Sequence, residues 1–160
     1  VITARDLSEG EFITVHAGQY LAELIARWQI LRPDCELLTA IDDDTAAIAL
    51  HLDGTVAQAI LNLLNNAADV SLNKIKLQLH HTNSELIFAI KDRGPGINPK
   101  QAAMLTKAFV STKGKGRGLG LFLSNATANR YGGTLSWQQR EGGGSRVELR
   151  LPLDKIQRSA

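Results

Sequence analysis

The spacing of apolar residues alternates between a helical and a strand-like period, and these changes predict the order of elements. A helical period over residues 15–31 and 55–71 predicts two helices, and Asp53 is placed to cap the second. A third helix is expected over 119–131, and a short one near 98–106. These helices are separated by strand-like runs throughout the chain.

Alternating or continuous apolar runs predict six short strands. They occupy residues 35–41, 46–50, 74–81, 85–92, 134–140 and 146–153. The last four form two pairs, each joined by a short polar or glycine-rich turn, which is typical of antiparallel hairpins. We therefore expect an α/β fold, a two-layer α/β sandwich in which a mixed, mostly antiparallel sheet carries helices on one face.

Length and composition fit one globular domain over residues 1–160, with 44% hydrophobic and 21% charged residues. A net charge of +2 does not favour nucleic acid as a partner, and no apolar run predicts membrane insertion of this segment. The single cysteine, Cys35, excludes an internal disulfide; burial as a small hydrophobe is favoured over a redox sensor. Because the chain begins at Val1, we expect a cytoplasmic piece of a larger protein.

The helix over 55–71 carries a group of polar side chains opposite its apolar face. Asn62, Asn66 and Asp69 follow one another at steps of four and three residues, so they share this face. Asparagine is a poor residue for a helix interior, and its amide oxygen suits Mg²⁺ that is already bound to phosphates. Simple solvent exposure explains the same pattern, so both interpretations stay open.

A second group is the run Asp92-Arg93-Gly94-Pro95-Gly96 at the end of a predicted strand. A carboxylate in this position can accept a hydrogen bond from an exocyclic amine. Glycines after it let the backbone turn sharply and approach a flat ring. Taken alone, such a run is also an ordinary turn.

A third group is the glycine- and lysine-rich run over residues 113–121, which leads into the predicted helix. Alternating glycines free the backbone amides to point at an anion, and the helix N-terminus adds positive potential. The spacing is not that of the P-loop. A flexible hinge is the alternative interpretation.

In order, NLLNNA on a helix, DRGPGI after a strand and GRGLGL opening a helix resemble the N, G1 and G2 boxes of the histidine-kinase ATP-binding domain. That domain belongs to the superfamily of gyrase B, Hsp90 and MutL, whose shared architecture is the Bergerat-type ATP-binding fold. The runs AFVSTK, GLGLFLSNATANRYGG and GGGSRVELRLPL are most similar to RegB/PrrB-type redox-responding sensor kinases.

The resemblance implies that the cofactors are ATP and Mg²⁺ and that their ligands follow the three boxes. Asn66 would coordinate Mg²⁺, with Asn62 as its companion one turn earlier. Asp92 would receive the adenine amino group, with Gly94 and Gly96 beneath the ring.

The same resemblance assigns the triphosphate to the glycine-rich run and the lid before it. Phe109 matches a phenylalanine of the box before the lid. The residues that would line the triphosphate are Gly116, Gly118, Leu119 and Gly120. Two departures stand out: Thr106 replaces the first phenylalanine of that box, and Asp69 replaces a cation. Lys113 or Arg117 would supply the missing positive charge.

The resemblance further implies transfer of the γ-phosphate to a histidine on a separate helical-hairpin domain. None of the four histidines (His16, His51, His80 and His81) lies in an H-[ED]-x-x-x-P pattern. The expected partners are an upstream dimerisation and histidine-phosphotransfer domain and a response regulator. An anchor of the parent protein in the inner membrane is compatible with this interpretation. The alternatives are an ATPase or serine kinase of the superfamily and a non-catalytic nucleotide-binding module. Asn62 disfavours the ATPase, because ATPases usually place a glutamate base there.

Overall fold

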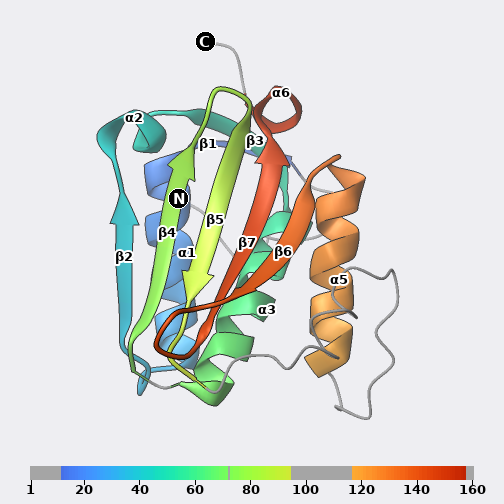
Figure 1. Cartoon of the computed structure of the whole chain (residues 1–160). Coiled ribbons are helices and arrows are strands. Elements are labelled where there is room, and N and C mark those ends of the chain that lie inside the picture. Colours follow the sequence, from blue (N-terminus) through green and yellow to red (C-terminus); the bar gives the residue numbers. More distant parts are fainter. Residues whose placement is uncertain (1–11, 72, 95–116, 158–160) are drawn as a thin grey trace.

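The main sheet has five strands in the order β2-β4-β5-β7-β6 (Figure 1). The computed structural model describes residues 12–71, 73–94 and 117–157. The strands of the main sheet are β2 (Leu37–Ile41), β4 (Ile75–His81), β5 (Glu85–Lys91), β6 (Thr134–Gln139) and β7 (Ser145–Pro152). Only β2 and β4 run parallel; the other neighbours are antiparallel.

The three long helices cover one face of this sheet, and its other face is open (Figure 1). They are α1 (Ala17–Leu31), α3 (Gly54–Val70) and α5 (Arg117–Arg130). The core lies between the layers, where Trp28, Leu64 and Phe88 are almost fully buried. This arrangement confirms the predicted two-layer α/β sandwich with a mixed, mostly antiparallel sheet.

Helix α3 forms for the reasons that its sequence suggests. Asp53 caps it, since its Oδ1 accepts a hydrogen bond from the Thr55 amide at 3.1 Å. The apolar face is fully buried, and each large aliphatic side chain there contributes about 1.5–3 kcal/mol. The residues of this face are Val56, Ile60, Leu63, Leu64 and Ala67. The opposite face, with Asn62 and Asn66, is therefore free to serve a site.

Several elements differ from the sequence prediction. Residues Phe12–His16 form a strand, β1, which was not predicted and which pairs with β3 (Ala49–Asp53). The first helix therefore begins at Ala17 and not at residue 15. Strand β3 itself lies three residues later than the strand predicted at 46–50. The acidic run after β2 begins a short helix, α2 (Asp43–Ala46), which Asp42 caps because its Oδ1 accepts from the Thr45 amide at 2.7 Å. A last short helix, α6 (Leu153–Ile156), follows β7.

The sequence analysis also made predictions about Cys35 and about a short helix near 98–106. Cys35 is buried, with 4% of its surface exposed, which fits the small-hydrophobe interpretation. The predicted helix near 98–106 lies outside the described residues. In the described part of the chain, no helix is both long and apolar enough to cross a membrane.

Candidate functional site

Asp92 lies at the end of β5 and is held in one orientation by its neighbours. Its carboxylate is buried, and Oδ1 accepts hydrogen bonds from the amides of Gly94 at 2.9 Å and Ser145 at 3.3 Å. The Asp92 amide donates to the Ser145 carbonyl at 3.0 Å. Among the described residues, none donates to Oδ2. This second oxygen is therefore available to a donor on a ligand.

The β6–β7 hairpin forms the back of this position. Gly144 has a φ of +98°, and a Cβ on it would overlap the carbonyl oxygen of Asp92. Arg140 donates from Nη1 to that same carbonyl at 2.8 Å. Arg140, Gly144 and Ser145 were not identified as site residues from the sequence. The signal was present, since three consecutive glycines precede Ser145 in the run that carried the resemblance.

Gly94 brings the Asp92 loop against the end of α3. A Cβ at Gly94 would lie 2.7 Å from Cγ2 of Val70 and 3.0 Å from its carbonyl oxygen, so only glycine fits without displacing the helix end. The close approach places Asp92 beside the last turn of the helix that carries the asparagines. Two of the predicted groups, distant in sequence, therefore meet in one region.

The three asparagines of α3 have different surroundings. The side chain of Asn65 is structural: its Oδ1 accepts from Trp28 Nε1 at 2.9 Å and so joins α3 to α1. Asn62 Oδ1 accepts from Gln58 Nε2 at 3.3 Å. Asn66 differs, since its Nδ2 is buried and has no hydrogen-bond partner among the described residues.

An unpaired buried amide costs about 1–3 kcal/mol, a cost that a polar ligand removes. The amide offers an oxygen and an NH₂ group, which fits a metal-bound phosphate. In the described residues no cluster of three or more His, Cys, Asp or Glu side chains forms a metal site.

Asp69 has a partner at Arg32, the residue that follows α1. Its Oδ1 lies 3.1 Å from Nη2 of Arg32, and both side chains are partly exposed. Asp69 stands where the resemblance leads one to expect a cation, and Arg32, which the sequence analysis did not identify, brings a positive charge beside it.

The third predicted group is only partly described. Gly96, Thr106, Phe109, Lys113 and Gly116 lie outside the described residues. Of the others, Arg117, Gly118, Leu119 and Gly120 form the first turn of α5, two residues before the predicted start. Backbone amides of a first helical turn lack partners within the helix, which suits an anion. Helix α5 packs on α3, where Ser124 Oγ donates to the Ala59 carbonyl at 3.2 Å.

A cavity of about 410 Å³ lies elsewhere, on the open face of the sheet over β6 and β7. Glu148 in its lining is bound by Arg146 and Arg150 at 2.6 Å each. None of the predicted site residues lines it. We therefore do not assign the nucleotide to this cavity, since its central charged groups are already paired.

Comparison with known proteins identifies the family of this chain. Residues 53–155 match the family described as "Histidine kinase-, DNA gyrase B-, and HSP90-like ATPase". The chain belongs to this family, and the predicted resemblance to its ATP-binding domain is confirmed.

Similar sequences include the sensor protein DegM of Bacillus sp. (strain B21-2), 25% identical over 144 residues, and the sensor protein TorS of Escherichia coli (strain K12), 36% identical over 120 residues. The matches cover 89% and 73% of this chain, but only 39% of DegM and 13% of TorS. The chain therefore spans well under half of these relatives.

Solved structures show the same fold. The Mycobacterial sensor histidine kinase MprB has a TM-score of 0.69 at 22% identity, covering 92% of this chain and 99% of that one. The catalytic domain of histidine kinase ThkA has a TM-score of 0.72 at 23% identity, covering 89% and 97%.

Proposed function

We propose that this chain is the ATP-binding catalytic domain of a sensor histidine kinase, which binds Mg·ATP and donates the γ-phosphate to a histidine on another domain. The family and the sensor proteins among its relatives support the class. The observation that carries the proposal is the pair formed by Asp92, with a free carboxylate oxygen, and Asn66, with an unpaired buried amide. The finer RegB/PrrB-type assignment rests on the sequence runs alone.

The roles of the residues follow from these contacts. Asp92 Oδ2 accepts from the adenine amino group, while its Oδ1 is kept in place by Gly94 and Ser145. Asn66 offers its amide to the metal-bound phosphates, whose negative charge Mg²⁺ neutralises. The first-turn amides of α5 bind the triphosphate, together with Lys113 or Arg117.

The acceptor histidine is expected outside this chain. His16, His51, His80 and His81 all lie on strands, whereas the acceptor expected from the resemblance lies on a helical hairpin. Two of them are also engaged: His51 Nδ1 bonds Thr14 Oγ1 at 3.0 Å, and His81 Nδ1 bonds Thr45 Oγ1 at 2.7 Å. The phosphotransfer domain, the response regulator, the cytoplasmic setting and an anchored parent remain predictions.

Phosphotransfer to a helical hairpin tests the proposal. The chain is incubated with γ-labelled ATP, alone and with the dimerisation hairpin of the same protein added in trans. We expect no label on the chain and an acid-labile, base-stable label on the hairpin, because phosphohistidine is lost in acid. A matched hairpin with its acceptor histidine changed to alanine is the control.

The other outcomes separate the alternatives. Rapid ATP turnover by the chain alone favours the ATPase, although Asn62 has no basic oxygen for that step. An acid-stable label on a partner serine favours the serine kinase. Nucleotide binding without any transfer leaves the non-catalytic module.

A further inference from the structure

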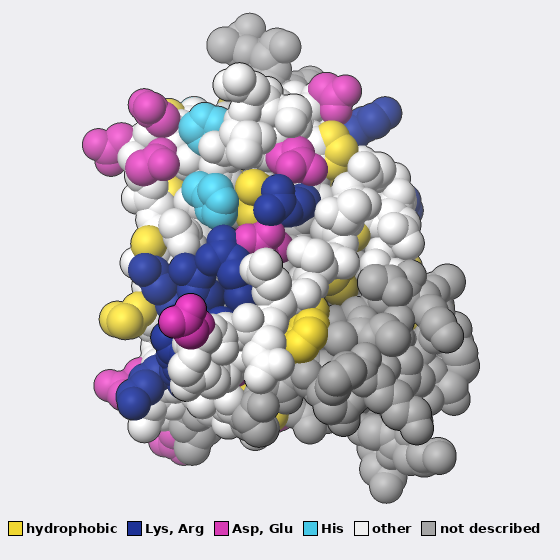
Figure 2. Space-filling view, viewed as in Figure 1, with side chains coloured by type: hydrophobic (Ala, Val, Ile, Leu, Met, Phe, Trp, Pro, Cys, Tyr) yellow, Lys and Arg dark blue, Asp and Glu magenta, His cyan; other side chains and the backbone are white. Residues whose placement is uncertain are grey.

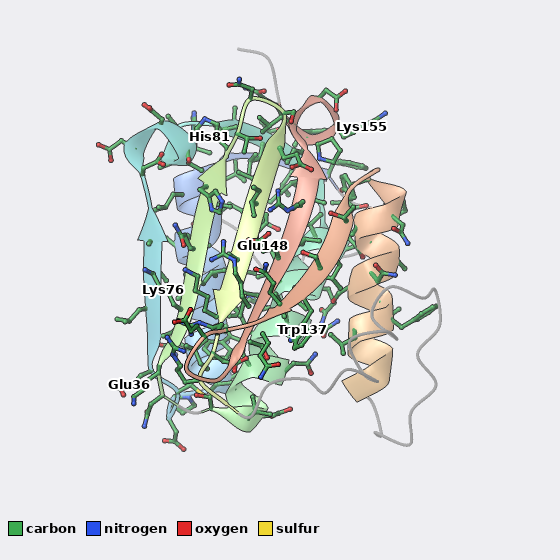
Figure 3. All side chains as sticks on the ribbon, in the orientation of Figure 1. Glu36, Lys76, His81, Trp137, Glu148 and Lys155 are labelled. Atoms are coloured by element: carbon green, nitrogen blue, oxygen red, sulfur yellow. The ribbon has the colours of Figure 1, made fainter. Side chains whose placement is uncertain are left out.

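Three cations lie side by side on the open face of the sheet. In the strand registers, Lys76 of β4 is opposite Lys91 of β5, and Lys91 is opposite Arg146 of β7. We call these three residues the cation row. They face away from the helices, because their strand neighbours, such as Ile75 and Ile90, belong to the core. Figure 2 shows the resulting group of dark blue side chains on this face, and Figure 3 labels Lys76 and the nearby Glu148.

This arrangement is unfavourable for the folded protein on its own. Like charges that lie directly opposite each other on neighbouring strands destabilise a sheet. Neighbouring strands are about 4.8 Å apart, so the charges of the row interact within one Debye length of about 8 Å. Burial, followed by the nearby charges of Arg146, Lys76 and Arg140, lowers the pKa of Lys91.

Few carboxylates of the described chain compensate the row. Glu148 binds Arg146 at 2.6 Å, but it also binds Arg150 at the same distance. Within the described ranges, neither Lys76 nor Lys91 forms an ion pair, and the Nζ of Lys91 donates a hydrogen bond to the neutral Gln78 Oε1 at 3.3 Å. Arg140 adds a further cation beside Lys91, which leaves this part of the face with excess positive charge.

We propose that the cation row is a docking surface for an acidic face of another protein domain. Carboxylates placed across the three strands would neutralise charges that now repel each other. The rest of the open face favours a protein over a membrane or nucleic acid. It carries Glu148, two residues from Arg146 along β7, and the acidic residues 42–44 directly follow the edge strand β2 at the start of α2 (Figure 1). A protein surface can present both signs, and so can complement the cation row and these carboxylates together, whereas a membrane or a nucleic acid presents only negative charge.

The row also lies directly behind the candidate site. Lys91 immediately precedes Asp92, and Arg146 immediately follows Ser145, whose amide binds the Asp92 carboxylate. Successive residues of a strand face opposite sides of a sheet. The docking surface and the Asp92 site therefore lie back to back on the same two strands. Docking does not require the proposed kinase function, and it is tested by binding alone.

The test uses the full chain and a fluorescently labelled decaglutamate peptide, with decaglutamine as the uncharged control. We expect decaglutamate to bind at low ionic strength, to release at high salt, and to bind more tightly than decaglutamine. Lys91→Gln should weaken decaglutamate binding about fivefold, because the loss of one close charge pair in water lowers the affinity by about that factor. Lys155→Gln, an exposed lysine on α6, removes the same charge and should leave binding within twofold.

A second measurement guards against misfolding. Because Lys91→Gln removes repulsion, its melting temperature should equal or exceed that of the original chain. Equal weakening by Lys91→Gln and Lys155→Gln would overturn the proposal, and so would no binding of decaglutamate. Tighter, Lys91-dependent binding to phosphatidylglycerol vesicles or to single-stranded DNA would contradict a protein as the occupant.

Discussion

The guanidinium of Arg32, just after α1, lies 3.1 Å from the carboxylate of Asp69 on α3. The same guanidinium lies 3.4 Å from Asn65 Oδ1, which also accepts from Trp28. Asp69 occupies a position where the resemblance leads one to expect a cation. The ion pair places a positive charge beside that position, supplied by the residue that follows α1.

This pairing predicts that Asp69 does little harm to nucleotide binding. Asp69→Asn should change ATP affinity less than threefold, because its charge is already compensated, and should cost less than about 1 kcal/mol of stability. Arg32→Gln, by contrast, should weaken ATP binding, since it leaves the carboxylate without this cation. Calorimetric titration measures both. A tenfold gain in ATP affinity for Asp69→Asn would show that the carboxylate acts on the phosphates.

The cap of α3 predicts a pH dependence of stability. Burial alone would raise the pKa of Asp53, but hydrogen bonds from Arg130, Thr55 and Tyr131 outweigh it and lower the pKa. Because the pKa of Asp53 is lower in the folded protein than in the unfolded chain, the ionised carboxylate stabilises the fold at pH values above the unfolded pKa of about 3.9. This stabilisation is lost as the pH falls through the pKa of the folded protein.

We therefore expect Asp53→Asn, which keeps a capping oxygen, to flatten the loss of stability below about pH 4. Urea unfolding at several pH values measures this loss, with Asp154→Asn, an exposed aspartate of α6, as the control. Parallel pH profiles for Asp53→Asn and the original chain would refute the assignment.

The hairpin behind Asp92 offers a matched pair of glycines. Gly143 and Gly144 both have positive φ, of 104° and 98°, so alanine strains the backbone at either position. Only at Gly144 does the new Cβ meet Asp92; at Gly143 nothing lies within 4 Å. Gly144→Ala should therefore be less stable than Gly143→Ala by about 1–3 kcal/mol and should bind ATP more weakly. Equal effects of the two changes would mean that the hairpin does not position Asp92.

The sequence predicted what depends on local patterns. The 3.6-residue period of its apolar residues and the cap at Asp53 define helix α3. The turn at 82–84 defines the β4–β5 hairpin, because Thr82 Oγ1 accepts hydrogen bonds from the amides of Ser84 and Glu85. Strand β1 was missed because its last two residues, Val15 and His16, were assigned to the predicted helix, and because its partner β3 is distant in the sequence. The parallel pairing of β2 with β4 was missed because no local turn specifies it.

The candidate site likewise contains residues that the sequence identified and supporting residues that it did not. Asn66 and Asp92 were identified from residue type and position, and they stay predictions as ligands. The support from Ser145, Arg140 and Arg32 depends on strand register and on helix packing, which a single sequence does not specify.

The free oxygen of Asp92 predicts selection of the base. Guanine presents a carbonyl where adenine presents its amine, so two acceptors would face each other, at a cost of about 1–3 kcal/mol or about 5- to 150-fold in affinity. In Asp92→Asn one oxygen still accepts from Gly94 and Ser145, and an NH₂ group replaces Oδ2. The ratio of ATP to GTP affinity should then fall. Equal binding of the two nucleotides by the original chain would remove Asp92 from the base site.

The central claim is that the chain binds ATP together with Mg²⁺ through Asn66. Calorimetric titration of ATP, with and without Mg²⁺, on the original chain and on Asn66→Ala tests it most directly. Alanine is a better helix former, so α3 stays folded, and Asn129→Ala, an exposed asparagine on α5, is the control. We predict that Mg²⁺ tightens ATP binding to the original chain and to Asn129→Ala. In the presence of Mg²⁺, Asn66→Ala should bind ATP about 10- to 100-fold more weakly than the original chain. The same Mg²⁺-dependent affinity in all three proteins would contradict the account.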